Sequence, residues 1–144
     1  MLEMIAHPDT LLGLGDGGAH VGIMCDATAT RPTHWTRDRG RGASFPVAWA
    51  IKRLSTDNAT AAGLQDRGLV RQEMKADLDV IDYDRLMLRG PEIVYDLPAG
   101  GKRLVQRTEG FDATIVSGAV VSRNGEPTGA LPGRLVRGMR SHAA

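Results

Sequence analysis

The first apolar run of the chain, residues 11–14, predicts a short buried strand. It ends at a glycine-rich segment, residues 15–18. A short apolar run closed by glycines is typical of a buried strand of a parallel sheet, with a loop at its carboxyl end. Residues 26–43 are polar and rich in Thr, Arg and Gly, which predicts a long surface loop.

Two helices are predicted after that loop. Residues 44–54 place apolar side chains at positions 47, 48, 51 and 54, which is the spacing of one helix face. Ser44 and Pro46 provide an N-cap and an early-turn proline for this helix. Thr56 is expected to cap a second, short helix over residues 57–62, which the following glycine ends.

The second half of the chain changes to the period of β-strands. Polar and apolar residues alternate over 76–82 and again over 103–108, which predicts half-buried strands. Residues 84–102 carry several Gly and Pro turn signals and are expected to be irregular. Strands joined by a turn at residues 117–118 are predicted over 113–122.

A second tight turn is expected at Asn124–Gly125, which is a strong hairpin signal. The chain therefore reads as an α/β segment followed by a small antiparallel β module. The candidate parallel strand has no parallel partner in the chain, although a parallel sheet needs strands on both sides and helices on its faces. The first half therefore has the character of the end of a larger fold.

Composition narrows the class of protein. The 144 residues suit one ordinary domain, and 18 basic against 17 acidic residues leave a net charge of +1. This balance argues against nucleic-acid and membrane-surface partners, which require an excess of positive charge on one face. No apolar run approaches the roughly 18 residues of a membrane span. The single Cys25 excludes an internal disulfide framework and predicts a cytoplasmic chain.

Asp16 is the sharpest chemical signal. It follows the predicted strand and stands before Gly17 and Gly18. Barrel and open-sheet enzymes place their working groups at the carboxyl ends of strands, and flanking glycines let backbone and solvent approach a carboxylate. The alternative is a turn aspartate that accepts hydrogen bonds from the following amides, and the pattern alone favours that alternative.

His20 stands four residues after Asp16, a combination that suggests a metal site or an acid–base pair. The alternative is a loop histidine that is exposed or merely hydrogen-bonded. His7, His34 and His142 are isolated and are expected to be structural or exposed. The sequence contains no H-x-H, H-E-x-x-H or C-x-x-C spacing that would supply the ligands zinc needs.

The remaining candidates carry less chemistry. Residues 13–18 match G-x-G-x-x-G, but the central carboxylate would repel a pyrophosphate, so nucleotide binding is discounted. Cys25 has no basic partner nearby and is expected to be an inert buried thiol. A basic loop is expected to be a solvated surface rather than a clamp for a substrate carboxylate; its arginines are Arg31, Arg37, Arg39 and Arg41.

A series of motifs occurs along the chain: G-D-G-G-A-H at 15–20, W-T-R-D-R-G at 35–40, L-Q-D-R-G at 64–68, A-D-L-D-V-I-D at 76–82, Y-D-L-P-A-G-G-K-R-L at 95–104, T-I-V-S-G at 114–118 and P-G-R-L-V-R at 132–137. In this order they resemble the C-terminal part of the N-acyl-D-amino-acid deacylases (D-aminoacylases) of the amidohydrolase superfamily. The D-L-P-A-G-G-x-R-L string is quite specific, whereas A-D-L-x-V-x-D is shared by amidohydrolases generally.

The resemblance implies a TIM barrel joined to a small β-sandwich that is built from both chain ends. Residues 1–62 would be the C-terminal end of the barrel domain, with its last strand and helices, and residues 63–144 would be strands of the β-sandwich. It also implies that Asp16 binds or faces a catalytic zinc and acts as general base on its water. His20, Gly17 and Gly18 are expected at the substrate.

The implied activity is hydrolysis of a linear amide C–N bond in an N-acyl-D-amino acid or a similar small molecule. The family's other metal ligands, including an early H-x-H pair, have no counterpart in this chain. We therefore expect a fragment of the amidohydrolase fold that binds no zinc and is inactive by itself. The alternative is a non-catalytic β-module or oligomerisation unit, and exposed edges are expected to drive self-association into a homo-oligomer.

Overall fold

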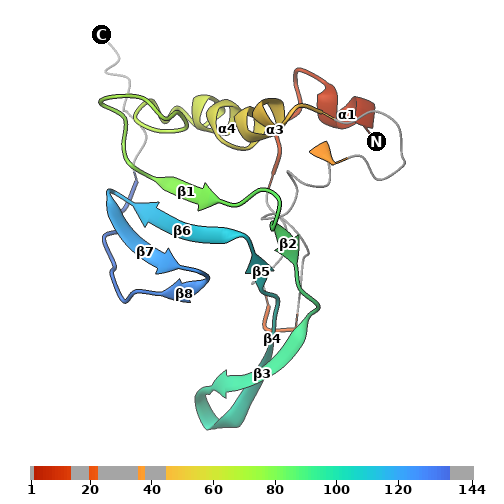
Figure 1. The fold of residues 1–144 in the computed structure, drawn as a ribbon, viewed down its shortest axis with the longest axis vertical. Coiled ribbons are helices and arrows are strands. Elements are labelled where there is room, and N and C mark those ends of the chain that lie inside the picture. The colour runs from red at the N-terminus through yellow and green to blue at the C-terminus, as the bar shows by residue number, and fades with distance from the viewer. Residues whose placement is uncertain (1, 14–19, 23–35, 38–44, 137–144) are drawn as a thin grey trace.

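The computed structural model describes residues 2–13, 20–22, 36–37 and 45–136. Within these residues the helices come first and the strands follow (Figure 1). The helices are α1 (Leu2–Ala6), α3 (Val47–Leu54) and α4 (Thr56–Ala61). The strands are β1 (Leu78–Ile81), β2 (Met87–Leu88), β3 (Glu92–Leu97), β4 (Gly101–Val105), β5 (Thr108–Glu109), β6 (Phe111–Val116), β7 (Ala119–Arg123) and β8 (Glu126–Pro127).

Every strand pair in the described part of the chain is antiparallel. A four-stranded sheet has the order β1-β6-β7-β8, and β2 with β5 and β3 with β4 form two separate ribbons. Figure 1 shows the helices lying above β1, while the ribbon of β3 and β4 extends away from the helices. The structure is therefore mostly antiparallel sheet with few helices.

The two predicted tight turns are confirmed. Ser117 and Gly118, between β6 and β7, have φ values of 50° and 82°, and Asn124 and Gly125, between β7 and β8, have the same values. Two successive positive φ values make a turn whose twist matches that of the flanking strands, which is why such short loops join hairpins. The predicted strands over 76–82 and 113–122 are present as β1, β6 and β7.

The expectation that residues 84–102 are irregular is wrong. They contain β2, β3 and the start of β4, and the glycine and proline signals belong to the tip of a hairpin. A 3₁₀ turn at Pro98–Gly100 joins β3 to β4, with Ala99 at a φ of 58°. Ile93 lies opposite Leu104 in this ribbon. The cluster of turn residues at the tip hid the short strands on either side of it.

The predicted strand over residues 11–14 is also not observed, because residues 11–13 belong to no strand. Leu12 is buried with 9% of its surface exposed, whereas Leu11 is 52% exposed. The carbonyls of Thr10 and Leu12 accept hydrogen bonds from the side chains of Arg53 and Asn58, not from a neighbouring strand. These backbone carbonyls are therefore hydrogen-bonded by side chains of the helices, as a neighbouring strand would do in a sheet.

The predicted helices are present with shifted starts. Pro46, which has an extended backbone, is the N-cap residue of α3, and Ser44 lies outside the described residues. Ser55, not Thr56, precedes α4, while the hydroxyl of Thr56 donates to the Gly68 carbonyl at 2.6 Å. The predicted boundary at residue 62, between a barrel domain and a β-sandwich domain, is not tested by the structure and stays a prediction.

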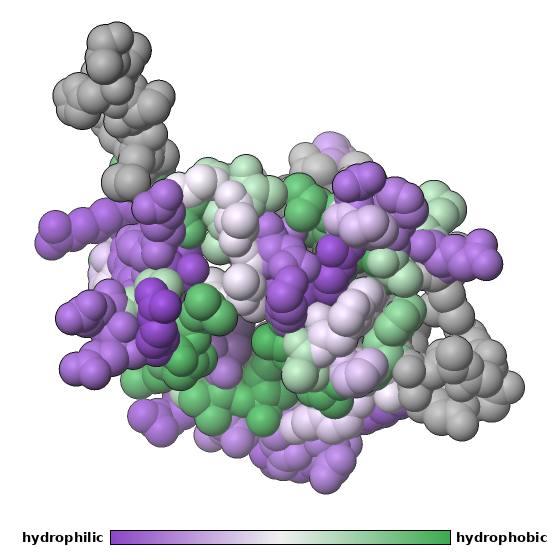
Figure 2. Space-filling model, turned by 90° about the horizontal axis from the view of Figure 1, so that it is seen from above, coloured by the Kyte–Doolittle hydropathy of each residue, from purple (hydrophilic) through white to green (hydrophobic). Residues whose placement is uncertain are grey.

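Helix α3 exposes the apolar side chains that its sequence pattern singles out. It buries Ala50 and Arg53, whereas Val47 and Ile51 are each 41% exposed. On the face seen from above the view of Figure 1, apolar side chains lie exposed among polar ones (Figure 2). The buried side of the helix is therefore partly polar, and its apolar side has no cover in the described structure.

The hydrophobic core of the described residues is small. Leu86 is its one large side chain that is almost fully buried, with 1% exposed, and the other buried apolar residues are Leu12, Ala50 and Ala59. None of the helices in the described ranges is long and apolar enough to cross a bilayer.

Candidate functional site

The main predicted catalytic residue, Asp16, lies outside the described residues, as do Gly17 and Gly18. The same holds for Cys25 and for the histidines and arginines of the sequence analysis at 31, 34, 39, 41 and 142. Of the predicted site residues, only His20 is described. What the structure adds is the geometry of the segments that flank residues 14–19.

His20 lies exposed in a tight turn after the glycine-rich segment. The backbone N–H of Gly22 donates to its Nδ1 atom at 3.1 Å. An Nδ1 atom that accepts a hydrogen bond places the proton of a neutral imidazole on Nε2, which is then a donor. The carbonyl of Val21 accepts a hydrogen bond from the N–H of Leu104 in β4 at 2.9 Å. Residues 20–22 are therefore attached to the ribbon of β3 and β4.

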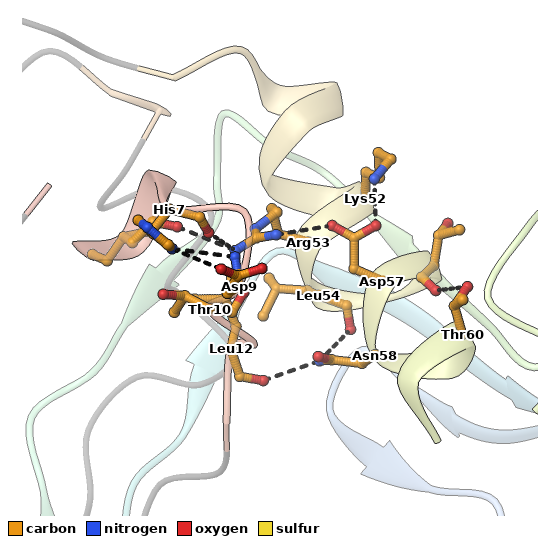
Figure 3. A network of polar contacts seen from close by, with 12 residues as sticks. His7, Asp9, Thr10, Leu12, Lys52, Arg53, Leu54, Asp57, Asn58 and Thr60 are labelled. Atoms are coloured by element: carbon orange, nitrogen blue, oxygen red, sulfur yellow. Dashed lines mark hydrogen bonds and ion pairs between the residues drawn. The ribbon is translucent and has the colours of Figure 1, made fainter. Parts of the chain in front are cut away.

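The segment before the glycines is attached to α3 through Arg53 (Figure 3). Arg53 is 8% exposed, and its Nη2 atom donates to the carbonyl oxygens of Ile5 at 3.3 Å and His7 at 3.1 Å. The same atom also donates to the carbonyl of Thr10. Its charge is balanced by Asp57, whose Oδ2 atom lies 3.3 Å from Nη1. One buried cation thus contacts the backbone along residues 5–10.

Asn58 in α4 provides a second attachment for the same segment. Its Nδ2 atom donates to the carbonyl of Leu12 at 3.0 Å and to that of Leu54, at the end of α3, at 3.3 Å. Leu12 is the last buried residue that the structure describes before the glycine-rich segment. Helices α3 and α4 therefore hold the backbone from residue 5 to residue 12 by side-chain hydrogen bonds (Figure 3).

Asp57 links this network to the surface. The ammonium group of Lys52 hydrogen-bonds its Oδ1 atom and lowers the pKa of the Asp57 carboxyl below its ordinary value. Arg53 adds to the lowering, while partial burial opposes it. The carboxylate therefore stays ionised at neutral pH and balances the guanidinium beneath it.

Arg37 corrects the prediction for the basic loop. Its guanidinium donates to the carbonyls of Leu86 at 3.3 Å and Asp84 at 3.1 Å, and also to that of Tyr83. It stacks over the Tyr83 ring at 4.9 Å from the centroid. Arg37 is thus neither a solvated side chain nor a substrate clamp, because it bonds to the turn between β1 and β2. No local sequence pattern indicates this contact with a distant turn.

A polar cleft of about 550 Å³ lies beside β5, β6 and the turn at Asn124–Gly125. Three arginines line it, and each is paired with a carboxylate. Arg85 lies 2.9 Å from Asp112, and Arg107 lies 3.6 Å from Glu126. Arg89 donates to Glu109 at 2.6 Å. The positive and negative side chains that line the cleft are therefore paired with one another.

The described residues do not fit a zinc site. No group of three His, Cys, Asp or Glu side chains converges anywhere in residues 2–13, 20–22, 36–37 and 45–136. His7 and Asp9 form a pair of this kind, with Nδ1 and Oδ2 atoms 3.8 Å apart, and both side chains are mostly exposed. Zinc needs three or four such donors.

Comparison with known proteins adds the missing context. A sequence model described as the amidohydrolase family matches residues 1–122, which is most of the chain. No curated protein and no solved structure matches it. The match covers the three described helices, the segment that contains Asp16, and the strands from β1 into β7.

Proposed function

This chain belongs to the amidohydrolase family, and we propose that it is the C-terminal part of a zinc-dependent hydrolase. The reaction is cleavage of the linear amide C–N bond of an N-acyl-D-amino acid or a similar small molecule. The family match over residues 1–122 carries the proposal of a hydrolase. The D-aminoacylase-like motifs, above all D-L-P-A-G-G-K-R-L at 96–104, support the choice of substrate.

Asp16 is the general base of the proposed reaction. Its carboxylate takes a proton from the attacking water and passes it to the leaving amine. Gly17 and Gly18 have no side chains to block the substrate, and His20 offers a hydrogen-bond donor at Nε2 on the far side of the same segment. Zinc in such an enzyme polarises the amide carbonyl and acidifies water. Because the described residues do not fit a zinc site, we derive no step through the metal.

Two features of the fold agree with a role as part of a larger enzyme. The apolar side chains of α3 at 47 and 51 are exposed, and residues 11–13, which precede Asp16, have no sheet neighbour in the described structure. A barrel that contained this chain would cover the helix and complete the sheet. In the complete enzyme, residues 1–62 are then the end of the barrel domain, and residues 63–144 belong to the β-sandwich.

The test is the variant Asp16→Asn in the complete enzyme, in which the barrel domain and this chain are both present. Loss of a general base lowers kcat/KM by about 10²–10⁴-fold, while the isosteric amide leaves the fold unchanged. His20→Asn is the matched control within the same loop and is expected to lose less. The measurement is kcat/KM on an N-acyl-D-amino acid, with zinc content determined in parallel. An Asp16→Asn variant that keeps more than about a tenth of the activity overturns the assignment and leaves Asp16 a turn residue.

A second candidate function is a non-catalytic oligomerisation unit, which the uncovered face of α3 favours. Val47 and Ile51 are exposed on adjacent turns of α3, and neighbouring chains can bury such a surface against each other. In the chain by itself, the proposed partner is a second copy. We further propose a cytoplasmic location without nucleic-acid or membrane partners, which rests on the single cysteine and the balanced charge.

A further inference from the structure

We propose that the polar cleft beside β5, β6 and the turn at Asn124–Gly125 binds a small zwitterion, a molecule with one carboxylate and one protonated amine. The cleft volume of about 550 Å³ lies in the range of ligand pockets. Every residue that lines the cleft belongs to the described part of the chain, and all of them lie in residues 85–126. The site therefore does not depend on the proposed function of Asp16.

The charges of the cleft explain the choice of a zwitterion. Three arginines and three carboxylates line it; these side chains are Arg85, Arg89, Arg107, Glu109, Asp112 and Glu126. A ligand with a net charge is attracted by one set of side chains and repelled by the other. A zwitterion can turn each of its two groups toward the opposite charge. The balanced lining therefore favours a ligand that is itself balanced.

Arg107 offers a place for the carboxylate of the ligand. Its Nε atom donates to Glu92 at 3.1 Å. Its Nη1 atom lies 3.6 Å from Oε1 of Glu126, which is too long for a hydrogen bond. Neither Nη atom of Arg107 therefore donates a hydrogen bond to any of the described residues. The parallel N–H groups of a guanidinium match the two oxygens of a carboxylate.

Glu126 in β8 offers the matching contact for the amine. Its side chain is 77% exposed, and within the described ranges it accepts no hydrogen bond. The other two charge pairs of the cleft are closed by hydrogen bonds, at 2.9 Å from Arg85 to Asp112 and at 2.6 Å from Arg89 to Glu109. Of the three pairs, Arg107 and Glu126 are thus the one that a ligand enters without breaking a hydrogen bond between them.

Gln106 gives an independent reason to expect an N–H group on the ligand. It lines the same cleft, and its Nε2 atom donates to the Arg89 carbonyl at 2.9 Å, which leaves Oε1 as the acceptor. This Oε1 atom is buried and has no hydrogen-bond partner among the described residues. Most buried polar atoms have a partner, and one that lacks it is unfavourable. The amine of a bound zwitterion supplies the missing donor.

The experiment titrates the whole chain with L-alanine and follows the backbone amide shifts by NMR. We expect saturable shifts at residues 106–112 and 124–126, with a Kd of about 10 mM, which suits a ligand of so few atoms. Two matched probes each lack one charge: propionate is alanine without its amine, and ethylammonium is alanine without its carboxylate. Both should bind about threefold to tenfold more weakly, because each loses one exposed charge contact. Trimethylated alanine keeps both charges but has no N–H, and it should also bind more weakly than alanine.

Variants assign the three contacts. Arg107→Gln should remove the preference for alanine over ethylammonium, and Glu126→Gln should remove the preference for alanine over propionate. A merely structural role of either side chain would not change which probe is preferred. Gln106→Leu should remove the difference between alanine and its trimethylated form. The control Arg103→Gln removes an exposed arginine that pairs with Asp96 outside the cleft, and it should leave all affinities as they are.

The wild-type chain decides the proposal even if a variant fails to fold. Saturable binding of alanine at the cleft, tighter than that of propionate and of ethylammonium, supports the site. The absence of saturable shifts, or equal affinities for alanine and propionate, overturns it. Unchanged preferences in Arg107→Gln and Glu126→Gln overturn the assigned contacts. Because no turnover is measured, a failure of this site leaves the proposed hydrolase function untouched, and the reverse also holds.

Discussion

The helical segment, residues 2–61, and the sheet, residues 78–127, are held together by different kinds of contact. In the sheet, β6, β7 and β8 follow one another through tight turns and are joined by backbone hydrogen bonds. In the helical segment, Arg53 and Asn58 bond to backbone carbonyls more than forty positions earlier in the chain. The sheet is therefore held by contacts between neighbours in the sequence, and the helical segment by a few polar contacts between residues far apart in the sequence.

The buried residues of the two regions differ in the same way. In the sheet region the most deeply buried large side chain is Leu86, which is apolar, and Gly110 packs against its backbone. Among the described residues of the helical region, the largest buried side chain is the charged Arg53. Apolar burial tolerates small shifts, whereas a buried cation without its partners is strongly unfavourable. The described backbone around Arg53 therefore has fewer alternative arrangements, but also less apolar surface to stabilise it.

The largest expected effect concerns the sheet region. Gly110→Ala places a Cβ 2.7 Å from the Cα of Leu86 and 2.8 Å from the carbonyl oxygen of Asp82, at a φ of +88°. Strain at positive φ costs about 1–2 kcal/mol, and overpacking adds about 1–3 kcal/mol. Urea unfolding should therefore show a loss of stability of about 2–5 kcal/mol.

Gly125→Ala is the matched control for Gly110→Ala. Gly125 has a similar φ of +82°, but an added Cβ there has no neighbour within 4 Å. Only the strain of about 1–2 kcal/mol is then expected. Equal losses in the two variants would mean that the close approach to Leu86 contributes nothing, and the packed turn would no longer distinguish the sheet region.

The next effect concerns the uncovered face of the helical segment. Replacing Val47 and Ile51 together by serine should weaken self-association of the chain by at least about tenfold, which corresponds to about 1.4 kcal/mol. Both side chains are 41% exposed and lie on one face of α3. Sedimentation over a range of concentrations measures the change.

The control is Val70→Ser, which removes an apolar side chain that is 88% exposed but does not belong to α3. Little change in association is expected from it. A wild-type chain that sediments as a monomer at every concentration would contradict self-association. Equal weakening by Val70→Ser would assign it to general hydrophobicity instead of the α3 face.

The difference between local contacts in the sheet and distant contacts in the helical segment explains which features the sequence could predict. The turns at Ser117–Gly118 and Asn124–Gly125 follow from residue types that favour positive φ, so the hairpins around them were predictable. The strands of the β3–β4 ribbon were missed, because the string D-L-P-A-G-G reads as loop although only Pro98–Gly100 forms the turn. Sequence signals of a few residues predict an element well where the contacts that form it are made by neighbouring residues.

The side-chain hydrogen bonds of the helical segment could not be predicted from local sequence signals. An apolar run such as residues 11–14 indicates burial but does not identify its neighbour. Here Asn58 bonds to the Leu12 carbonyl and Arg53 bonds to the carbonyl of Thr10, just before the run. Arg53 follows Lys52 in the sequence, and the apolar spacing of residues 44–54 gave it no role. The one available signal was its spacing from Ala50 and Asp57, at i−3 and i+4 on the same helical side. The pattern singled out Asp16 as a candidate, whereas its catalytic role is implied only by the resemblance to a family and stays a prediction.

The smallest expected effect is the response to acid, which again separates the two regions. A hydrogen bond from Lys52, assisted by Arg53, lowers the pKa of Asp57 in the helical segment, and one from Arg103 lowers the pKa of Asp96 in the β3–β4 ribbon. A carboxyl whose pKa is lower in the folded than in the unfolded state stabilises the fold above its unfolded pKa of about 3.9. That contribution is lost as the pH falls through the folded value.

The free energy of unfolding should therefore be nearly constant from about pH 7 to pH 5 and fall below about pH 4. Asp57→Asn should flatten this fall more than Asp96→Asn, because Asp57 balances the buried Arg53, whereas Asp96 pairs with an exposed arginine. Exposed ion pairs contribute little and are screened by salt, so salt should remove the Asp96 contribution first. Urea unfolding of the two variants at pH 6, 4 and 3, with and without added salt, measures the difference. If Asp96→Asn flattened the acid response as much as Asp57→Asn, the buried guanidinium would be balanced by another group, and the two regions would not differ in how they use charge.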